Sequence, residues 1–286
     1  MKNSKIAWTT HTFNPWWGCV KVSEGCKHCY AEALAKRTGH HVWGPTAPRR
    51  TFNEKHWHTP LSWNRDAELA GERARVFCAS MADVFEDNPA IEWERSKLWP
   101  LIEATPMLDW LLLTKRPENM NRMVPASWIE GWPANAWALT TVEDDAHAWR
   151  AAALLNVPAR VRGLSVEPMI GPVDLTNVRV KHSDGLGFYS VDVLSGETWE
   201  DMYVRPAHGP AINWVIIGGE SGAGCRPMQI EWVRDLMRQC QDAGVPVFMK
   251  QLGGNPNKRD NPDEWPEDLR VREFPKEVHA QTSGAV

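Results

Sequence analysis

The chain has 286 residues, of which 43% are hydrophobic and 24% charged, and its net charge at pH 7 is -4. This size fits one large domain or two small ones, and a core of this size needs no disulfides to hold it. Without an apolar run of eighteen residues or an apolar signal core, we expect a cytoplasmic protein with no membrane partner, and the slightly acidic charge disfavours broad nucleic-acid binding.

Short apolar runs alternate with helical patterns along the chain. Wholly apolar runs of about five residues are typical of buried parallel strands. In chain order we predict a strand at 5–9, a helix at 31–37, an ordered loop at 39–62, a strand at 75–79, a helix at 91–102, strands at 110–114 and 137–141, a helix at 144–155, strands at 161–166 and 214–218, a helix at 230–243 and a strand at 247–250.

This alternation predicts an α/β fold with a parallel sheet. A partial TIM-like (βα) barrel of about six to seven parallel strands fits the pattern, and an open doubly wound sheet fits it almost as well. Residues 174–212 interrupt the rhythm, and we expect an inserted hairpin or lid there. We expect one domain over residues 1–272 and a flexible tail over 273–286.

Small, polar or charged residues follow every predicted strand after the first. In parallel βα folds the active site lies at the carboxyl ends of the strands. Strands also end in polar residues simply because they reach the surface, but six cases in a row directly after apolar strands favour a shared functional edge. The candidates are Ser80, Asp83, Lys115, Glu143, Glu167, Glu220 and Lys250.

Three of the six cysteines lie in the stretch WGCVKVSEGCKHCY, residues 17–30, at Cys19, Cys26 and Cys29. A structural zinc site would need a fourth ligand, and the candidates are His11 and His28, of which His28 lies between two of the cysteines and is badly placed to join them. A disulfide is disfavoured in a reducing compartment, and plain burial does not explain the clustering beside glycines. A [4Fe–4S] cluster held by three thiolates would leave one iron open, which explains why there are three cysteines.

The cysteine loop resembles the cluster loop of the radical S-adenosylmethionine superfamily. It follows the first predicted strand and leads directly into a helix, but its spacing is C-x6-C-x2-C where most members have C-x3-C-x2-C. A closer resemblance, to a phage- and prophage-associated three-cysteine family grouped with enzymes such as spore photoproduct lyase, covers most of the chain. It rests on the strings NPWWGC, CKHCYAE, LLLTKRPENM, LSVEPMIGPV, WVIIGGESG, CRPM and AGVPVFMKQLGG.

This resemblance implies a cofactor set and a chemistry. A [4Fe–4S] cluster bound by Cys19, Cys26 and Cys29 would hold S-adenosylmethionine at its open iron. One electron from a flavodoxin- or ferredoxin-type donor would cleave it to a 5′-deoxyadenosyl radical, which would abstract hydrogen from the substrate. A partner protein could complete such a site.

The strand-end residues can be given roles within this scheme. We expect Lys115 to pair with the methionine carboxylate, Ser80 to hydrogen-bond the cofactor, and Asp83 or Glu143 to accept from its amine or ribose. For each residue a salt bridge between strand ends is an equal alternative. The candidates for the catalytic, substrate-facing positions are Glu167, Glu220 and Lys250.

The resemblance to phage-borne enzymes implies a nucleotide, DNA or tRNA as the substrate class, and one loop, APRRTFNEKHWHTP at residues 47–60, bears on it. Basic residues interleaved with aromatic ones suit phosphate contact and base stacking, so we expect a nucleotide or nucleic-acid substrate, with an ordinary solvated loop as the alternative. The competing function is a zinc-stabilised, non-catalytic nucleic-acid-binding or phage accessory protein. The loop residues concerned are Arg49, Arg50, Lys55, His56, Trp57 and His58.

Overall fold

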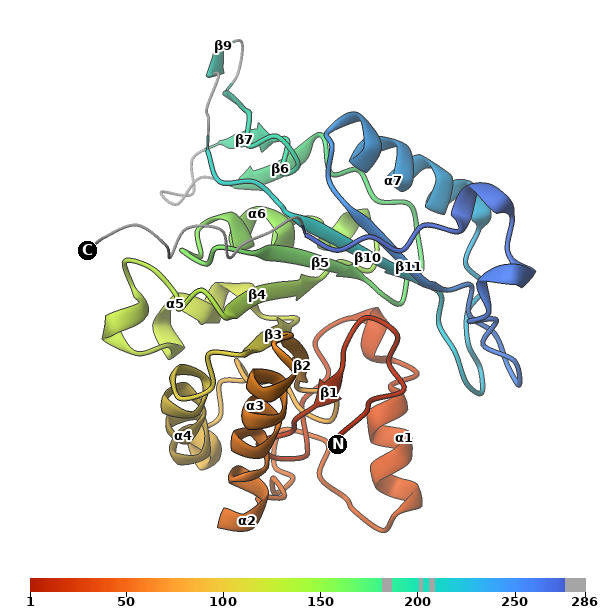
Figure 1. The fold of residues 1–286 in the computed structure, drawn as a ribbon. Coiled ribbons are helices and arrows are strands. Elements are labelled where there is room, and N and C mark those ends of the chain that lie inside the picture. Colours follow the sequence, from red (N-terminus) through yellow and green to blue (C-terminus); the bar gives the residue numbers. More distant parts are fainter. Residues whose placement is uncertain (182–186, 201–202, 206–208, 276–286) are drawn as a thin grey trace. The chain divides into compact units, whose positions relative to one another are not determined.

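The computed structural model describes residues 1–181, 187–200, 203–205 and 209–275 (Figure 1). Parts of the predicted insert, and the predicted tail from residue 276 onward, lie outside these residues. The chain divides into two compact units, Met1–Leu139 and Thr140–Val286.

Helices and strands alternate through most of the chain. The helices are α1 (Tyr30–Arg37), α2 (Glu54–Trp57), α3 (Thr59–Ala70), α4 (Glu92–Glu103), α5 (Met120–Met123), α6 (Trp149–Leu155) and α7 (Ile230–Asp242). The strands are β1 (His11–Thr12), β2 (Ala74–Cys78), β3 (Leu108–Thr114), β4 (Ala136–Thr141), β5 (Arg162–Val166), β6 (Val178–Lys181), β7 (Phe188–Val191), β8 (Thr198–Glu200), β9 (Tyr203–Arg205), β10 (Trp214–Gly218) and β11 (Val247–Gln251). Short 3-10 helices occupy Glu24–Cys26, Pro89–Ile91, Pro117–Asn119, Ala126–Trp128, Asp145–His147, Pro262–Glu264 and Glu267–Leu269.

The main sheet has seven strands in the order β1-β2-β3-β4-β5-β10-β11. The pairs β1–β2, β2–β3, β5–β10 and β10–β11 are parallel. This confirms the predicted α/β fold of the partial TIM-like type. A doubly wound sheet would reverse its strand order at a switch point, whereas this order follows the chain from one edge to the other.

The first strand lies later in the sequence than predicted. Residues 5–9 form no strand, and the two residues of β1 pair with Val76 and Phe77 of β2. The side chain of Thr9 takes the place of a backbone ladder, because its hydroxyl donates to the carbonyl of Arg75 (2.9 Å) and accepts from the amide of Phe77 (3.0 Å). Of the predicted strand only Trp8 and Thr9 are buried, so the run indicated a contact with β2 at its end but not a strand.

The predicted loop at 39–62 was wrong in its second half, which forms α2 and begins α3. The side chain of Asn53 accepts from the amide of His56 and caps α2, and Pro60 lies in the first turn of α3. Only Pro60, Trp63 and Ala67 of α3 are buried. This narrow apolar stripe packs against β2 and β3 and explains why the periodicity was easy to miss.

The second unit is built on β5, β10 and β11. Helix α7 buries Val233, Leu236 and Cys240, which recur at the spacing of one helical face. It ends before Gly244, whose φ of +69° is the left-handed conformation that commonly follows a helix. The helix predicted at 144–155 is confirmed only from Trp149, because a 3-10 turn precedes it.

The predicted insert contains a small antiparallel sheet in the order β6-β7-β8-β9. Antiparallel pairing agrees with a hairpin-like insertion, and its use as a lid stays a prediction. None of the helices in the described part of the chain has both the length and the apolar character needed to cross a membrane.

Asn135 provides a test of how the first unit is held together. Its buried amide nitrogen donates to the carbonyls of Ile102 (2.9 Å), Thr105 (3.1 Å) and Leu108 (3.2 Å), which joins the end of α4 to β3. Replacing Asn135 with Ala removes the buried amide donor that links these three carbonyls and should lower the free energy of unfolding by about 1 kcal/mol. Urea unfolding followed by tryptophan fluorescence measures this, and exposed Glu68→Ala is the control, which should change little.

Candidate functional site

The three clustered cysteines lie on the loop that leads from β1 to α1. Cys19, Cys26 and Cys29 are half-buried and carry free thiols. Cys26 ends a short 3-10 helix, and Cys29 is the residue that precedes the first turn of α1. Burial raises the pKa of Cys29, and the backbone amides of Ala31 and Glu32 at the helix start oppose that rise.

A close backbone approach fixes the start of this loop. Gly18 has a φ of +118°, and a Cβ added there would lie 2.3 Å from the carbonyl oxygen of Val42. Its amide donates to the carbonyl of Met81 (2.9 Å), and the carbonyl of Cys19 accepts from the amide of Gly44 (3.0 Å). Glycine is therefore required beside the first cysteine.

A buried ion pair holds residues 42–49, the segment that packs against Gly18. Arg49 contacts Glu86 with 2.5 Å between Nη2 and Oε1, and both side chains are at most 3% exposed. The guanidinium also donates to the carbonyls of Val42, Gly44 and Ala47. Arg49 thus ties residues 42–49 to the loop after β2.

These contacts make Arg49 and Trp57 unavailable for the phosphate and base contact predicted for residues 47–60. Arg49 is buried in its ion pair, and Trp57 is only 5% exposed. Arg50 is half-buried, with its guanidinium 4.5 Å from the ring centre of Trp17. For Arg49, Arg50 and Trp57 the pattern reflects internal ion-pair and cation–π packing. Lys55 and His58, in contrast, are exposed, and substrate contact by this loop stays a prediction.

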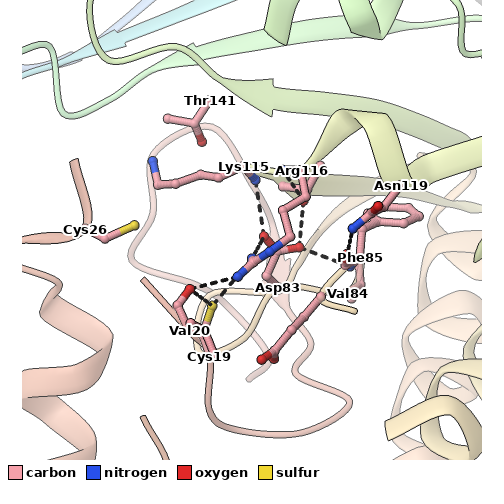
Figure 2. A network of polar contacts seen from close by, with 12 residues as sticks. Cys19, Val20, Cys26, Asp83, Val84, Phe85, Lys115, Arg116, Asn119 and Thr141 are labelled. Carbon is pink, nitrogen blue, oxygen red and sulfur yellow. Dashed lines mark hydrogen bonds and ion pairs between the residues drawn. The ribbon is translucent and has the colours of Figure 1, made fainter. Parts of the chain in front are cut away.

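Asp83 joins the end of β2 to the end of β3 (Figure 2). Its Oδ1 accepts from the hydroxyl of Thr114 (2.6 Å) and the amide of Phe85 (3.0 Å). Its Oδ2 accepts from Nη1 of Arg116 (2.7 Å) and the amide of Lys115 (3.2 Å). Because the carboxylate already accepts four hydrogen bonds, it organises the strand ends, and its contact with a cofactor stays a prediction.

Arg116 reaches from this network to the first cysteine. Its Nη2 donates to the carbonyl of Val20 (2.8 Å), and its Nη1 lies 3.8 Å from Sγ of Cys19. Burial and the charge of Asp83 raise the pKa of the Cys19 thiol to about 12, and the positive charge of Arg116 opposes that rise. A thiolate at this position would therefore have Arg116 as its neighbouring cation.

Two further predicted cofactor residues lie in the first unit. The hydroxyl of Ser80 contacts the side-chain amide of Asn14 (3.2 Å), and its carbonyl accepts from the hydroxyl of Tyr30 in α1 (3.0 Å). In Figure 2 the side chain of Lys115 extends toward the side on which Cys26 is drawn. The structure thus places Ser80 and Lys115 in the same unit as the three cysteines, and their predicted roles are still open.

The donor set suits a cluster better than a single ion. His11, a candidate zinc ligand, accepts at Nδ1 from the amide of Asn3 (3.2 Å) and packs on Trp63. Within the described residues, no three His, Cys, Asp or Glu side chains are grouped as ligands of one metal ion. Each thiolate of an iron–sulfur cluster binds its own iron, so three half-buried thiols on one loop fit that group chemically.

In the second unit, Glu167 after β5 and Lys250 in β11 form an ion pair. Both side chains are 19% exposed. Gly218 of β10 lies between them in the strand order and leaves room, because a Cβ there would lie 3.2 Å from Cδ of Glu167. Two of the three predicted catalytic residues are thus brought together.

A β-bulge directs Lys250 to this pair. Ile217 pairs with Met249 and Gly218 pairs with Gln251, so Lys250 is the extra residue of β11. Met249 and Gln251 are buried, whereas Lys250 is half-buried. Bulges of this kind often redirect a side chain next to an active site.

The two remaining acidic candidates are buried in ion pairs with arginines. Glu220 accepts from Nε (2.9 Å) and Nη2 (2.6 Å) of Arg226 and closes the loop after β10. Glu143 accepts from Nη1 of Arg150 (2.6 Å), with both side chains at most 3% exposed. The catalytic role of Glu220 and the cofactor-binding role of Glu143 stay predictions. The observed contacts agree with the alternative considered for both residues, a salt bridge near the strand ends.

A family profile described as "Protein of unknown function (DUF5131)" matches residues 3–283. The chain belongs to this family. A search of curated proteins found no match.

Among solved structures, variants of spore photoproduct lyase are similar to this DUF5131 chain. One, with bound AdoMet and dinucleoside spore photoproduct, gives a TM-score of 0.41 at 14% identity; another gives 0.41 at 16%. Each match covers 58% of this chain and 48% of the lyase, so the chain spans about half the length of these lyases. A likeness of this size identifies neither an activity nor a ligand.

Three features of this DUF5131 chain were missed by sequence reasoning. They are the contact of Arg116 with Cys19, the room that Gly218 leaves for Glu167, and the bulge at Lys250. The first joins residues 97 positions apart, for which a single sequence carries no local signal. For the second, the pair Gly218-Gly219 at the end of an apolar run was a sign that another group packs closely against the backbone there.

The Arg49–Glu86 pair of this DUF5131 chain yields a stability prediction. Glu86→Leu leaves a buried, unpaired guanidinium and should lower the free energy of unfolding by about 3–5 kcal/mol. Arg49→Met combined with Glu86→Leu should recover a large part of the loss, because no charge is then buried alone. Urea unfolding of the four members of the double-mutant cycle measures this. Equal losses in the single and double variants would contradict the pairing.

Proposed function

We propose that this chain is a radical S-adenosylmethionine-type enzyme. Cys19, Cys26 and Cys29 would hold a [4Fe–4S] cluster, with S-adenosylmethionine at the iron that no protein ligand occupies. The observation that carries the proposal is one loop, after the first strand of a partial βα barrel, with three free and half-buried thiols. When bound, the cluster and S-adenosylmethionine supply reductive cleavage and a carbon radical.

The number of thiols supports a catalytic site over a structural one. Structural metal sites are closed by four protein ligands, whereas catalytic sites keep one position open. The zinc alternative lacks a well-placed fourth ligand, because His11 contacts Asn3 and Trp63 and His28 lies between two of the three cysteines in the sequence. The three-cysteine strings that resemble radical S-adenosylmethionine proteins point the same way.

The chain's own residues would bind the cofactor and hold the loop. Lys115 carries the positive charge proposed to pair with the methionine carboxylate, and Ser80 is a neutral hydrogen-bonding group beside the start of α1. Asp83 would act indirectly, by fixing the backbone of Lys115 and the guanidinium of Arg116. We assign Glu143 the same indirect role through Arg150.

The substrate-facing residues are proposed to be Glu167 and Lys250. Their pair is partly exposed, so either group can exchange its partner for a substrate atom, while Glu220 keeps the adjacent loop closed through Arg226. A nucleotide or nucleic acid remains the proposed substrate class. A flavodoxin- or ferredoxin-type protein is the proposed electron donor, and a partner protein completing the site is compatible with this scheme.

Iron and sulfide content tests the proposal directly. After anaerobic reconstitution, the chain should hold about four irons and four sulfides, as expected for one [4Fe–4S] cluster. The protein should be brown and show a broad band in its visible absorption spectrum. Replacing Cys19, Cys26 and Cys29 with Ala should abolish this, and Cys240→Ala, on α7, is the matched thiol control. Reduction in the presence of S-adenosylmethionine should yield 5′-deoxyadenosine and methionine.

One tightly bound zinc in a colourless protein that takes up no iron would overturn the proposal. That result would favour the zinc-stabilised binding protein. A cluster without S-adenosylmethionine cleavage would instead indicate a chain that binds the cofactor but lacks the radical step.

Substitution of the Glu167–Lys250 pair tests the substrate-facing assignment. Single-stranded DNA, RNA and mixed mononucleotides are added separately to the reduced, reconstituted protein, and we expect one of them to stimulate 5′-deoxyadenosine formation. Glu167→Gln and Lys250→Met should keep iron content and basal cleavage but reduce the stimulation by roughly 10²-fold, the loss typical of an acid–base group. Full stimulation in both variants would place the substrate elsewhere.

A further inference from the structure

Arg116 is held where its charge acts on one cysteine in particular. Its guanidinium makes three contacts at once: with Oδ2 of Asp83 (2.7 Å), with the carbonyl of Val20 (2.8 Å) and with Sγ of Cys19 (3.8 Å) (Figure 2). The Arg116 side chain is 10% exposed and that of Asp83 is 8% exposed. Two of the three contacts fix the planar guanidinium, and the third directs an N–H group at the sulfur.

Two carboxylates and one guanidinium act on the charge of Cys19. Asp83 and Glu86 both disfavour negative charge on its sulfur, and Arg116 is the cation that favours it. Glu86 is itself paired with Arg49, whose guanidinium donates to the carboxylate of Glu86 and to backbone carbonyls. In a poorly solvated site, a charge at hydrogen-bond distance acts far more strongly than the same charge in water.

We propose that Arg116, positioned by Asp83, sets the reduction potential of the cluster through the sulfur of Cys19. The inference rests on the proposed function, because it needs a cluster on that sulfur. Hydrogen bonds to the ligand sulfurs and the net local charge are known determinants of iron–sulfur potentials. The positive guanidinium stabilises the reduced cluster and the negative carboxylate of Asp83 destabilises it. The two charges therefore shift the reduction potential in opposite directions.

The electron balance is simple. One electron passes from an external reductant, a flavodoxin- or ferredoxin-type protein or dithionite, to the cluster, and no bond is made or broken. The cluster gains one negative charge, part of which resides on the thiolate sulfurs. Arg116 remains protonated throughout, so no proton moves with the electron.

Two variants with opposite expected effects test this. Arg116→Gln removes the cation and should make reduction at least tenfold less favourable, which is about 59 mV more negative for one electron. Asp83→Asn removes the opposing anion while keeping an acceptor for Arg116, and should shift the potential in the positive direction. The control is Arg122→Gln, which removes an arginine that is 58% exposed in the same unit and should leave the potential nearly unchanged.

The potentials are measured by anaerobic spectroelectrochemical titration of the reconstituted proteins, with iron content and the electron paramagnetic resonance spectrum of the reduced state recorded for each. Shifts of both variants in the same direction, as general loosening of the loop would give, would overturn this inference. Unchanged potentials at full iron content would overturn this inference and leave the proposed function intact.

If Arg116→Gln takes up no iron, Asp83→Asn decides alone, and absence of a positive shift overturns the inference. A wild-type chain that takes up no iron overturns both.

Discussion

Pairing of buried carboxylates with arginine is the constraint on which the strand-end loops depend. Asp83 with Arg116, Glu86 with Arg49, Glu143 with Arg150 and Glu220 with Arg226 all have a carboxylate that is at most 8% exposed. A buried charge is tolerable only when it is paired and hydrogen-bonded. Because the planar guanidinium can also donate to carbonyls, each pair fixes backbone as well as charge.

Within each unit, the arginine–carboxylate pairs hold the backbone, and the candidate functional groups are other side chains. In the first unit, Arg49 and Arg116 fix the two chain neighbours of Cys19: Arg49 holds Val42, which packs against Gly18, and Arg116 donates to the carbonyl of Val20. The thiols themselves stay half-buried and unbridged. The loop is therefore held by its neighbours and not by its own cysteines, which leaves the sulfurs available to a metal group.

Sequence reasoning succeeded where the signal is local. Apolar runs located β2, β3, β4, β5, β10 and β11, and their alternation with helices gave the fold. It failed where a side chain substitutes for backbone pairing, as Thr9 does beside β2, and where the apolar stripe is narrow, as in α3. The acidic strand-end residues were found by position, but their partners were not, because Arg116 and Cys19 meet only once β3 lies beside the cysteine loop.

The choice of cation distinguishes Glu167 from the other acidic strand-end residues. Arginine grips a carboxylate through a rigid fork and is always charged, whereas lysine is a point charge on a flexible stem. Lys250 reaches Glu167 from a bulge that pairs with nothing on β10, and both side chains keep contact with solvent. Replacing this lysine contact with a substrate contact would cost less than breaking a buried arginine pair. Among these pairs, Glu167–Lys250 is therefore the one best suited to exchange its partner for another group.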